Sequence, residues 1–60
     1  MKHYHVTFMS DDGSIHAIKT WARNEEHARQ RATARINEIL SHIGYTFVDS
    51  DIVAIELIRE

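Results

Sequence analysis

The sequence contains no cysteine, no proline and only two glycines. The lack of cysteine excludes disulfide bonds and thiolate zinc sites. No stretch approaches the ~20 consecutive apolar residues that cross a membrane, and no apolar signal segment follows Met1. The formal net charge of −2 argues against general electrostatic binding of nucleic acid, so such binding requires a local basic patch. We therefore expect a cytoplasmic protein that holds no cofactor and contacts no membrane.

The short chain limits how the fold can be stabilised. Its 60 residues form one domain at most. A domain of this size buries only about 60% of the surface that its unfolded chain exposes. Disulfides, metals or oligomerisation commonly stabilise domains this small, and disulfides are excluded here. Association with a second copy or with a partner protein is therefore the expected source of additional stability.

Short local signals mark where the predicted elements begin and end. Asp12-Gly13 follows an alternating segment and favours a tight hairpin, because glycine adopts a positive φ without a steric penalty. Asn24 is a favoured helix N-cap, and the two glutamates after it suit the positive end of a helix dipole. Gly44 follows an amphipathic run and is typical of a left-handed C-cap.

The hydrophobic periodicity predicts three strands and one helix. Strands are expected at about residues 2–9, 14–22 and 52–59, and a helix at about residues 25–43. A right-handed crossover makes the last strand parallel to the second, so we place it antiparallel beside the first. The predicted fold class is α+β, a single ββαβ domain with a three-stranded sheet in the order 2-1-3. One helix packs on one face through an apolar stripe: Ala28, Ala32, Ile36, Ile39, Leu40 and Ile43.

One helix covers only one face of the predicted sheet, so the other face stays open. We expect these residues to face the helix: Tyr4, Val6, Phe8, Ile18, Ala22, Val53, Ile55 and Leu57. Large apolar side chains then remain on the open face, where polar ones are usual, and such a patch indicates an interface. The predicted interface residues are Met9, Ile15, Trp21, Ile52 and Ile58. Two alternatives are a one-residue register change that reverses a strand's faces, and coverage of this face by residues 45–48.

A second candidate surface lies along one flank of the predicted helix. It combines Arg23, His27, Arg31, Arg35 and His42. A row of arginines can contact phosphates or an acidic protein. The alternative is an ordinary solvated flank in which nearby glutamates form local ion pairs with these residues and with Arg29.

The histidines and carboxylates indicate no catalytic or metal site. His3 and His5 point to the same side of the first strand, but a metal ion needs at least a third ligand, and His16 reaches them only in some registers. We therefore predict no metal site. The sequence lacks a cysteine nucleophile, a phosphate-binding loop and a serine nucleophile elbow, so we also predict no enzymatic activity.

These observations predict a small protein-binding module, most simply a homodimer that associates through the open sheet face. Residues 20–28 resemble a common strand-to-helix junction of small hairpin-plus-helix domains, which specifies packing rather than function. The size and composition also resemble those of phage and mobile-element proteins that bind a larger host protein as inhibitors or accessory factors. The alternative function is nucleic-acid binding through the basic helix flank.

Overall fold

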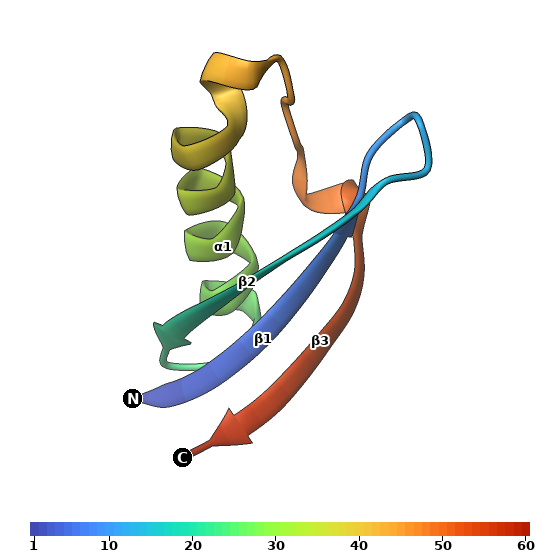
Figure 1. Ribbon diagram of the computed structural model, residues 1–60. Coiled ribbons are helices and arrows are strands. Elements are labelled where there is room, and N and C mark those ends of the chain that lie inside the picture. The colour runs from blue at the N-terminus through green and yellow to red at the C-terminus, as the bar shows by residue number, and fades with distance from the viewer.

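The computed structural model describes residues 1–60 and contains three strands and one α-helix (Figure 1). In chain order these are β1 (Lys2–Met9), β2 (Ile15–Ala22), α1 (Glu25–Leu40) and β3 (Ile52–Arg59). β1 lies in the centre of the sheet and pairs antiparallel with both neighbours, so the strand order is β2-β1-β3. The predicted α+β class, the ββαβ arrangement and the strand order are confirmed.

A tight turn around Asp12 and Gly13 joins β1 to β2. The backbone N–H of Gly13 donates to the carbonyl of Ser10, and the N–H of Ser10 donates to the carbonyl of Ser14, both at 2.9 Å. Gly13 has a φ of 86°, a region that glycine adopts without the clash of a Cβ. Asp12 Oδ1 accepts the N–H of Ser14 at 2.9 Å and the hydroxyl of Ser10. The turn thereby fixes the register of the whole hairpin.

The helix begins at the predicted cap and ends earlier than predicted. Asn24 has an extended backbone, and its Oδ1 accepts the N–H of His27 at 2.9 Å. α-Helical geometry stops at Leu40, and the chain continues as a short 3₁₀ turn, η1 (Ser41–Ile43). Such tightening is frequent at helix C-termini. Gly44 then ends the segment at a φ of 95°, in the predicted left-handed conformation.

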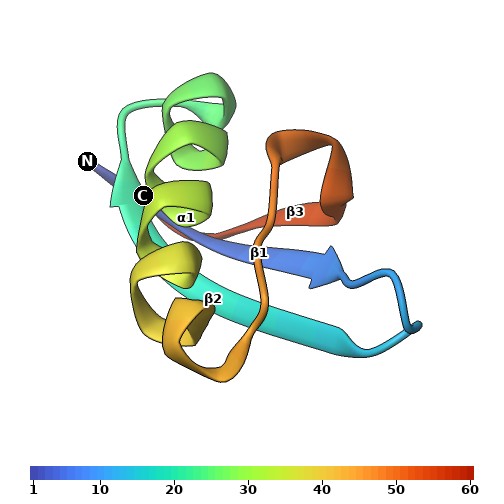
Figure 2. The same cartoon turned by 90° about the horizontal axis from the view of Figure 1, so that it is seen from above.

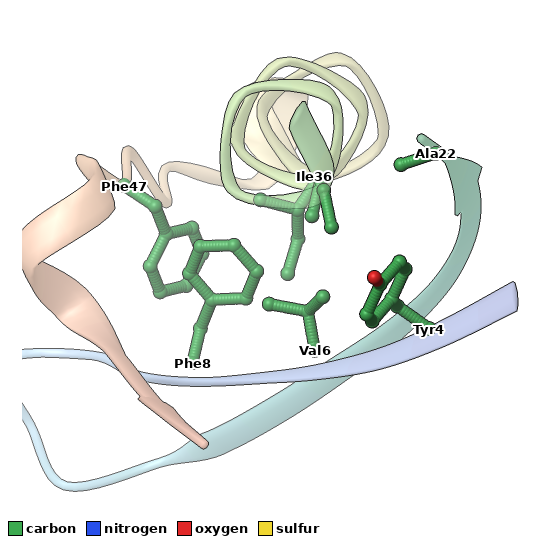
Figure 3. Close-up of a cluster of buried hydrophobic side chains, with 8 residues drawn as sticks. Tyr4, Val6, Phe8, Ala22, Ile36 and Phe47 are labelled. Carbon is green, nitrogen blue, oxygen red and sulfur yellow. The ribbon is translucent and has the colours of Figure 1, made fainter. Parts of the chain in front are cut away.

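The core lies between α1 and the sheet (Figure 3). Val6 and Phe8 of β1 are fully buried, and the small alanines of α1 let the helix backbone approach them closely. Ile39 and Ile43 remain 48% and 58% exposed, so the buried stripe of the helix is narrower than predicted. The core consists of Tyr4, Val6, Phe8, Ala22, Ala28, Ala32, Ile36 and Phe47.

Residues 44–48, here called the return segment, close this core on the helix side of the sheet (Figure 2). Phe47 is buried, and its ring centroid lies 5.3 Å from that of Phe8. Asn37 of α1 fixes the segment: its Nδ2 donates to the Phe47 carbonyl at 2.8 Å, and the Phe47 N–H donates to its Oδ1 at 2.7 Å. A second 3₁₀ turn, η2 (Asp49–Asp51), leads into β3. The alternative in which residues 45–48 cover the opposite sheet face is therefore wrong.

Candidate interaction surfaces

The sheet face opposite α1, here called the outer face, is open. In the register of the strands, its residues stand in rows across the sheet: Trp21, His3 and Arg59; Lys19, His5 and Glu56; Ala17, Thr7 and Ala54; and, next to the turn, Ile15 and Met9. Ile58 adjoins the first row. The large apolar side chains of the face are therefore at its two ends: Trp21 and Ile58 beside His3 and Arg59 at one end, and Ile15 and Met9 at the other. The rows between them are charged (Lys19, His5 and Glu56) or small (Ala17, Thr7 and Ala54).

The structure places most of the predicted interface residues on this face. Met9 and Ile15 lie opposite one another and are 43% and 57% exposed, while Trp21 is 44% exposed at the other end. The alternative of a shifted hairpin register is therefore wrong. These residues form two separate apolar patches rather than one, and their role in an interface stays a prediction.

Trp21 is held flat against a neighbouring side chain. Its ring stacks on that of His3, with centroids 4.3 Å apart and an interplanar angle of 5°. The two residues are directly opposite in the β1–β2 register. A stacked indole of this kind is restrained before any partner arrives, which lowers the entropy lost when it is buried in a complex.

The predicted outer-face position of Ile52 is wrong. Ile52 pairs with Phe8 and packs against the core on the helix side. The reason is an irregularity in the β1–β3 register: Thr7 pairs with Ala54, so Val53 is left as the extra residue of a β-bulge. An extra residue reverses the alternation beyond it. Val53, which was expected to face the helix, is accordingly half-exposed.

A second irregularity lies at the other end of β3. Tyr4 pairs with Leu57 and His3 pairs with Arg59, so Ile58 is the extra residue there. Ile58 is exposed, in keeping with the prediction. Leu57 has the predicted facing, yet it is 48% exposed because α1 packs mainly on β2 and β1 and leaves β3 largely uncovered.

The polar row across the outer face contains the only ion pair of the structure. His5 Nδ1 lies 3.9 Å from Glu56 Oε1, a pair that is charged only when the histidine is protonated. Lys19 lies opposite His5 on the other side. A partner that covers the whole outer face must therefore match a polar centre as well as two apolar ends.

The predicted basic flank is only partly assembled. Arg31 and Arg35 line one shallow groove together with Thr20, Ala34 and Glu38. His42 is exposed in the 3₁₀ turn η1, beyond the end of α1.

His27 takes part in the helix cap rather than in a free basic surface. Its Nδ1 accepts the backbone N–H of Arg23 at 3.0 Å, in return for the bond from its own N–H to Asn24. Partial burial lowers the pKa of His27, and the positive charges of Arg23 and Arg31 lower it further. At neutral pH the His27 ring is therefore uncharged, and the arginines supply the positive charge of this flank.

The local ion pairs expected for a solvated flank do not form. No arginine lies within 4.0 Å of a carboxylate, and this includes Arg35 near Glu38. Arg29 lies on the other side of the helix, in a groove between α1 and β3 that Glu25 also lines. The guanidinium groups are thus free to contact an external group.

His16 faces the helix side, opposite to His3 and His5. It pairs with Phe8, and its ring centroid lies 4.8 Å from Tyr45 and 5.6 Å from Phe47. Its buried Nε2 has no hydrogen-bond partner. No group of three or more potential metal ligands occurs in the structure. Sequence reasoning missed this aromatic cluster, because nothing local links His16 to residues of the return segment.

No protein-family model, curated protein or solved structure matches this chain. The helices are too short or too polar to span a membrane.

Proposed function

We propose that the chain is a small, non-enzymatic protein-binding module whose outer face is its interaction surface. The observation that supports this most directly is that α1 and the return segment both lie on the same side of the sheet, as Figure 2 shows. The outer face is left without a covering element although it carries Trp21, Met9, Ile15 and Ile58. Exposed apolar patches of this kind mark interaction sites in small proteins.

The outer face also indicates what kind of partner fits it. Trp21 and Ile58 at one end, and Met9 and Ile15 at the other, offer two apolar anchor points. Tryptophan is among the residues that most often dominate binding energies at interfaces. The intervening row of Lys19, His5 and Glu56 requires polar or charged groups from the partner. We expect a larger protein target in the cytoplasm, as for phage or mobile-element inhibitors and accessory proteins.

Substitutions on the two apolar ends test this proposal. The chain is used as bait in a lysate of its source, captured proteins are identified, and each is purified and titrated against the chain by calorimetry. Ile15→Lys and Trp21→Ala should each weaken binding about tenfold or more, because both remove buried contact from an anchor. Ile43→Lys is the matched control, since Ile43 is 58% exposed against 57% for Ile15 but lies in η1, beyond the end of α1.

Circular dichroism establishes that each variant is folded before it is titrated. Unchanged affinity in both outer-face variants refutes the proposal, as does an Ile43→Lys variant that loses binding as strongly as they do.

A second candidate function is nucleic-acid binding through Arg31 and Arg35, and the unpaired state of their guanidinium groups favours it. Glu38 lines the same groove, and the chain carries a net charge of −2, both of which oppose a phosphate backbone. The flank also lacks aromatic side chains for base stacking. The outer face is therefore the better-supported surface.

A further inference from the structure

The open edge of β3 is a second unpartnered feature, distinct from the outer face. Val53, Leu57 and Ile58 are 54%, 48% and 49% exposed, although they belong to one strand of eight residues. A groove of about 180 Å³ separates this strand from α1. β3 is therefore an edge strand with exposed apolar side chains, and Figure 1 shows that no other element lies beside its free edge.

The two edges of the sheet differ in how they are protected. β2 carries the exposed Lys19 near its middle and packs against α1. β3 has neither lysine nor proline, the residues that commonly prevent edge strands from pairing. Its bulges lie towards its two ends, and Ala54–Leu57 pairs regularly with β1 between them. The regular stretch of β3 is thus available to another strand.

The hydrogen-bond pattern determines which backbone groups point outward. The backbone N–H of Ser10 donates to the Ser14 carbonyl, so these two residues form a hydrogen-bonded pair. Hydrogen-bonded and non-hydrogen-bonded pairs alternate along an antiparallel ladder. Val6 and Phe8 therefore direct their N–H and C=O groups towards β2. His5 and Thr7 then direct theirs towards β3, where they meet Glu56 and Ala54. It follows that Ile55 directs its N–H and C=O to the open edge.

We propose that β3 pairs antiparallel with β3 of a second copy of this chain, about a two-fold axis at Ile55. This register sets Ile55 against Ile55 of the second copy and Leu57 against its Val53. Apolar residues then meet apolar ones, and no like charges stand opposite each other. Moving the two-fold axis to Glu56, a shift of two residues in the pairing, instead sets Glu56 against Glu56, which is unfavourable.

The self-complementarity of the regular stretch favours a second copy over an unrelated strand. Ala54–Leu57 lies between the two bulges, and pairing about Ile55 sets Glu56 of each copy against Ala54 of the other. Two-fold symmetry produces this contact twice, since one self-complementary patch serves both copies.

The resulting dimer has a six-stranded sheet with both helices on the same side. The two outer faces become one continuous surface, while the β3 edge disappears. A contact limited to one strand and its flanking side chains falls at the low end of interface sizes, about 1,200 Å² or less, so we expect dissociation in the micromolar range. This pairing goes beyond the proposed function, because it uses the sheet edge and does not require the outer face to bind a partner.

The test is sedimentation equilibrium of the full chain over a concentration series. The wild type should approach twice the 7.0 kDa chain mass. Leu57→Lys should weaken dimerisation about tenfold or more, because it places a charge in the apolar strand pair. Ile39→Lys should leave dimerisation unchanged, since Ile39 has the same 48% exposure but lies on the helix.

A charge placed opposite Glu56 tests the register itself. Ala54 is exposed, and in this register it faces Glu56 of the second copy. Ala54→Lys should strengthen the dimer, whereas Ala54→Glu sets two carboxylates opposite each other and should weaken it. A wild type that stays monomeric at the highest concentrations, a dimer that survives Leu57→Lys, or an Ala54→Glu dimer as strong as that of Ala54→Lys each overturns the proposal. A chain synthesised with an N-methyl group on Ile55 should be monomeric and folded, which separates loss of edge pairing from loss of the fold.

Discussion

At the scale of single residues, Asp12 has the most specific contacts in the structure. Its carboxylate accepts bonds from the Ser10 hydroxyl and the Ser14 N–H within the turn, and from the Tyr45 hydroxyl at 3.3 Å. These bonds favour the ionised form, and the hydrogen bond from Ser10 contributes most, so the pKa of Asp12 lies far below its usual value. Asp12 therefore couples the hairpin turn to the return segment.

We predict that Asp12→Ala lowers the thermal unfolding midpoint at neutral pH, whereas Asp11→Ala, which removes no hydrogen bond of the structure, leaves it nearly unchanged. The folded pKa of Asp12 lies below the unfolded value of about 3.8. The contribution of Asp12 to the stability of the fold is therefore complete above the unfolded pKa. It declines as the pH falls through the folded pKa. The difference between wild type and Asp12→Ala should accordingly shrink in strong acid.

Thermal scans of the wild type and both variants, from neutral pH down to about pH 2, measure the difference in unfolding midpoint above and below the usual aspartate pKa. Equal midpoints for Asp12→Ala and Asp11→Ala at neutral pH contradict this role for Asp12.

The sequence predicts a turn at Asp12-Gly13 but not the contact with Tyr45. The turn depends on local chemistry, namely a glycine at a positive φ and an aspartate that bonds nearby backbone groups. Tyr45 approaches Asp12 only after the helix and the return segment have packed, so no local pattern indicates the contact. The same reason explains why the unpartnered His16 beside Tyr45 and Phe47 is not predictable.

At the scale of elements, local signals were sufficient to predict the hairpin, the helix cap and the strand order. They failed at the start of β3. A strict two-residue alternation assigned Ile52 to the outer face and Val53 to the core, and the bulge at Val53 reverses both. A bulge inserts one residue relative to the partner strand, and its position depends on the pairing rather than on β3 alone. Sequence periodicity cannot supply that information.

Asn37 links two elements, α1 and the return segment, and we predict that its loss destabilises the domain. Asn37→Ala removes both side-chain bonds to the Phe47 backbone and leaves a buried N–H and C=O without partners. The free energy of unfolding should fall by about 1–3 kcal/mol, the penalty for such groups. Asn37→Asp keeps the acceptor for the Phe47 N–H, so it should lower the free energy of unfolding by less than Asn37→Ala.

Urea unfolding followed by circular dichroism measures both variants. If Asn37→Ala is as stable as the wild type, the return segment is not held by Asn37 and the core must close in another way.

At the scale of the whole molecule, the chain covers only part of its sheet. Its core of eight residues lies under α1 and the return segment, while β3 and the outer face retain half-exposed apolar side chains. Domains of this size have little stability in reserve. A partner that binds these surfaces in the folded state only would stabilise the fold of the 60-residue chain.

The outer face and the groove of Arg31 and Arg35 lie on different sides of the molecule. Each of them contains one exposed alanine at which a probe can be placed. Ala17 is on the outer face between the two apolar ends, and Ala34 lines the groove of Arg31 and Arg35 on the helix. The residues have equally small side chains and both are exposed. A probe placed at each position therefore compares the two functions in one experiment.

The most direct measurement is photo-crosslinking in the source cells, with a photoreactive amino acid at position 17 or at position 34. We predict a discrete covalent adduct with another protein at position 17 and none at position 34. Adducts at position 34 alone, or at neither position, contradict the claim that the outer face is the interaction surface.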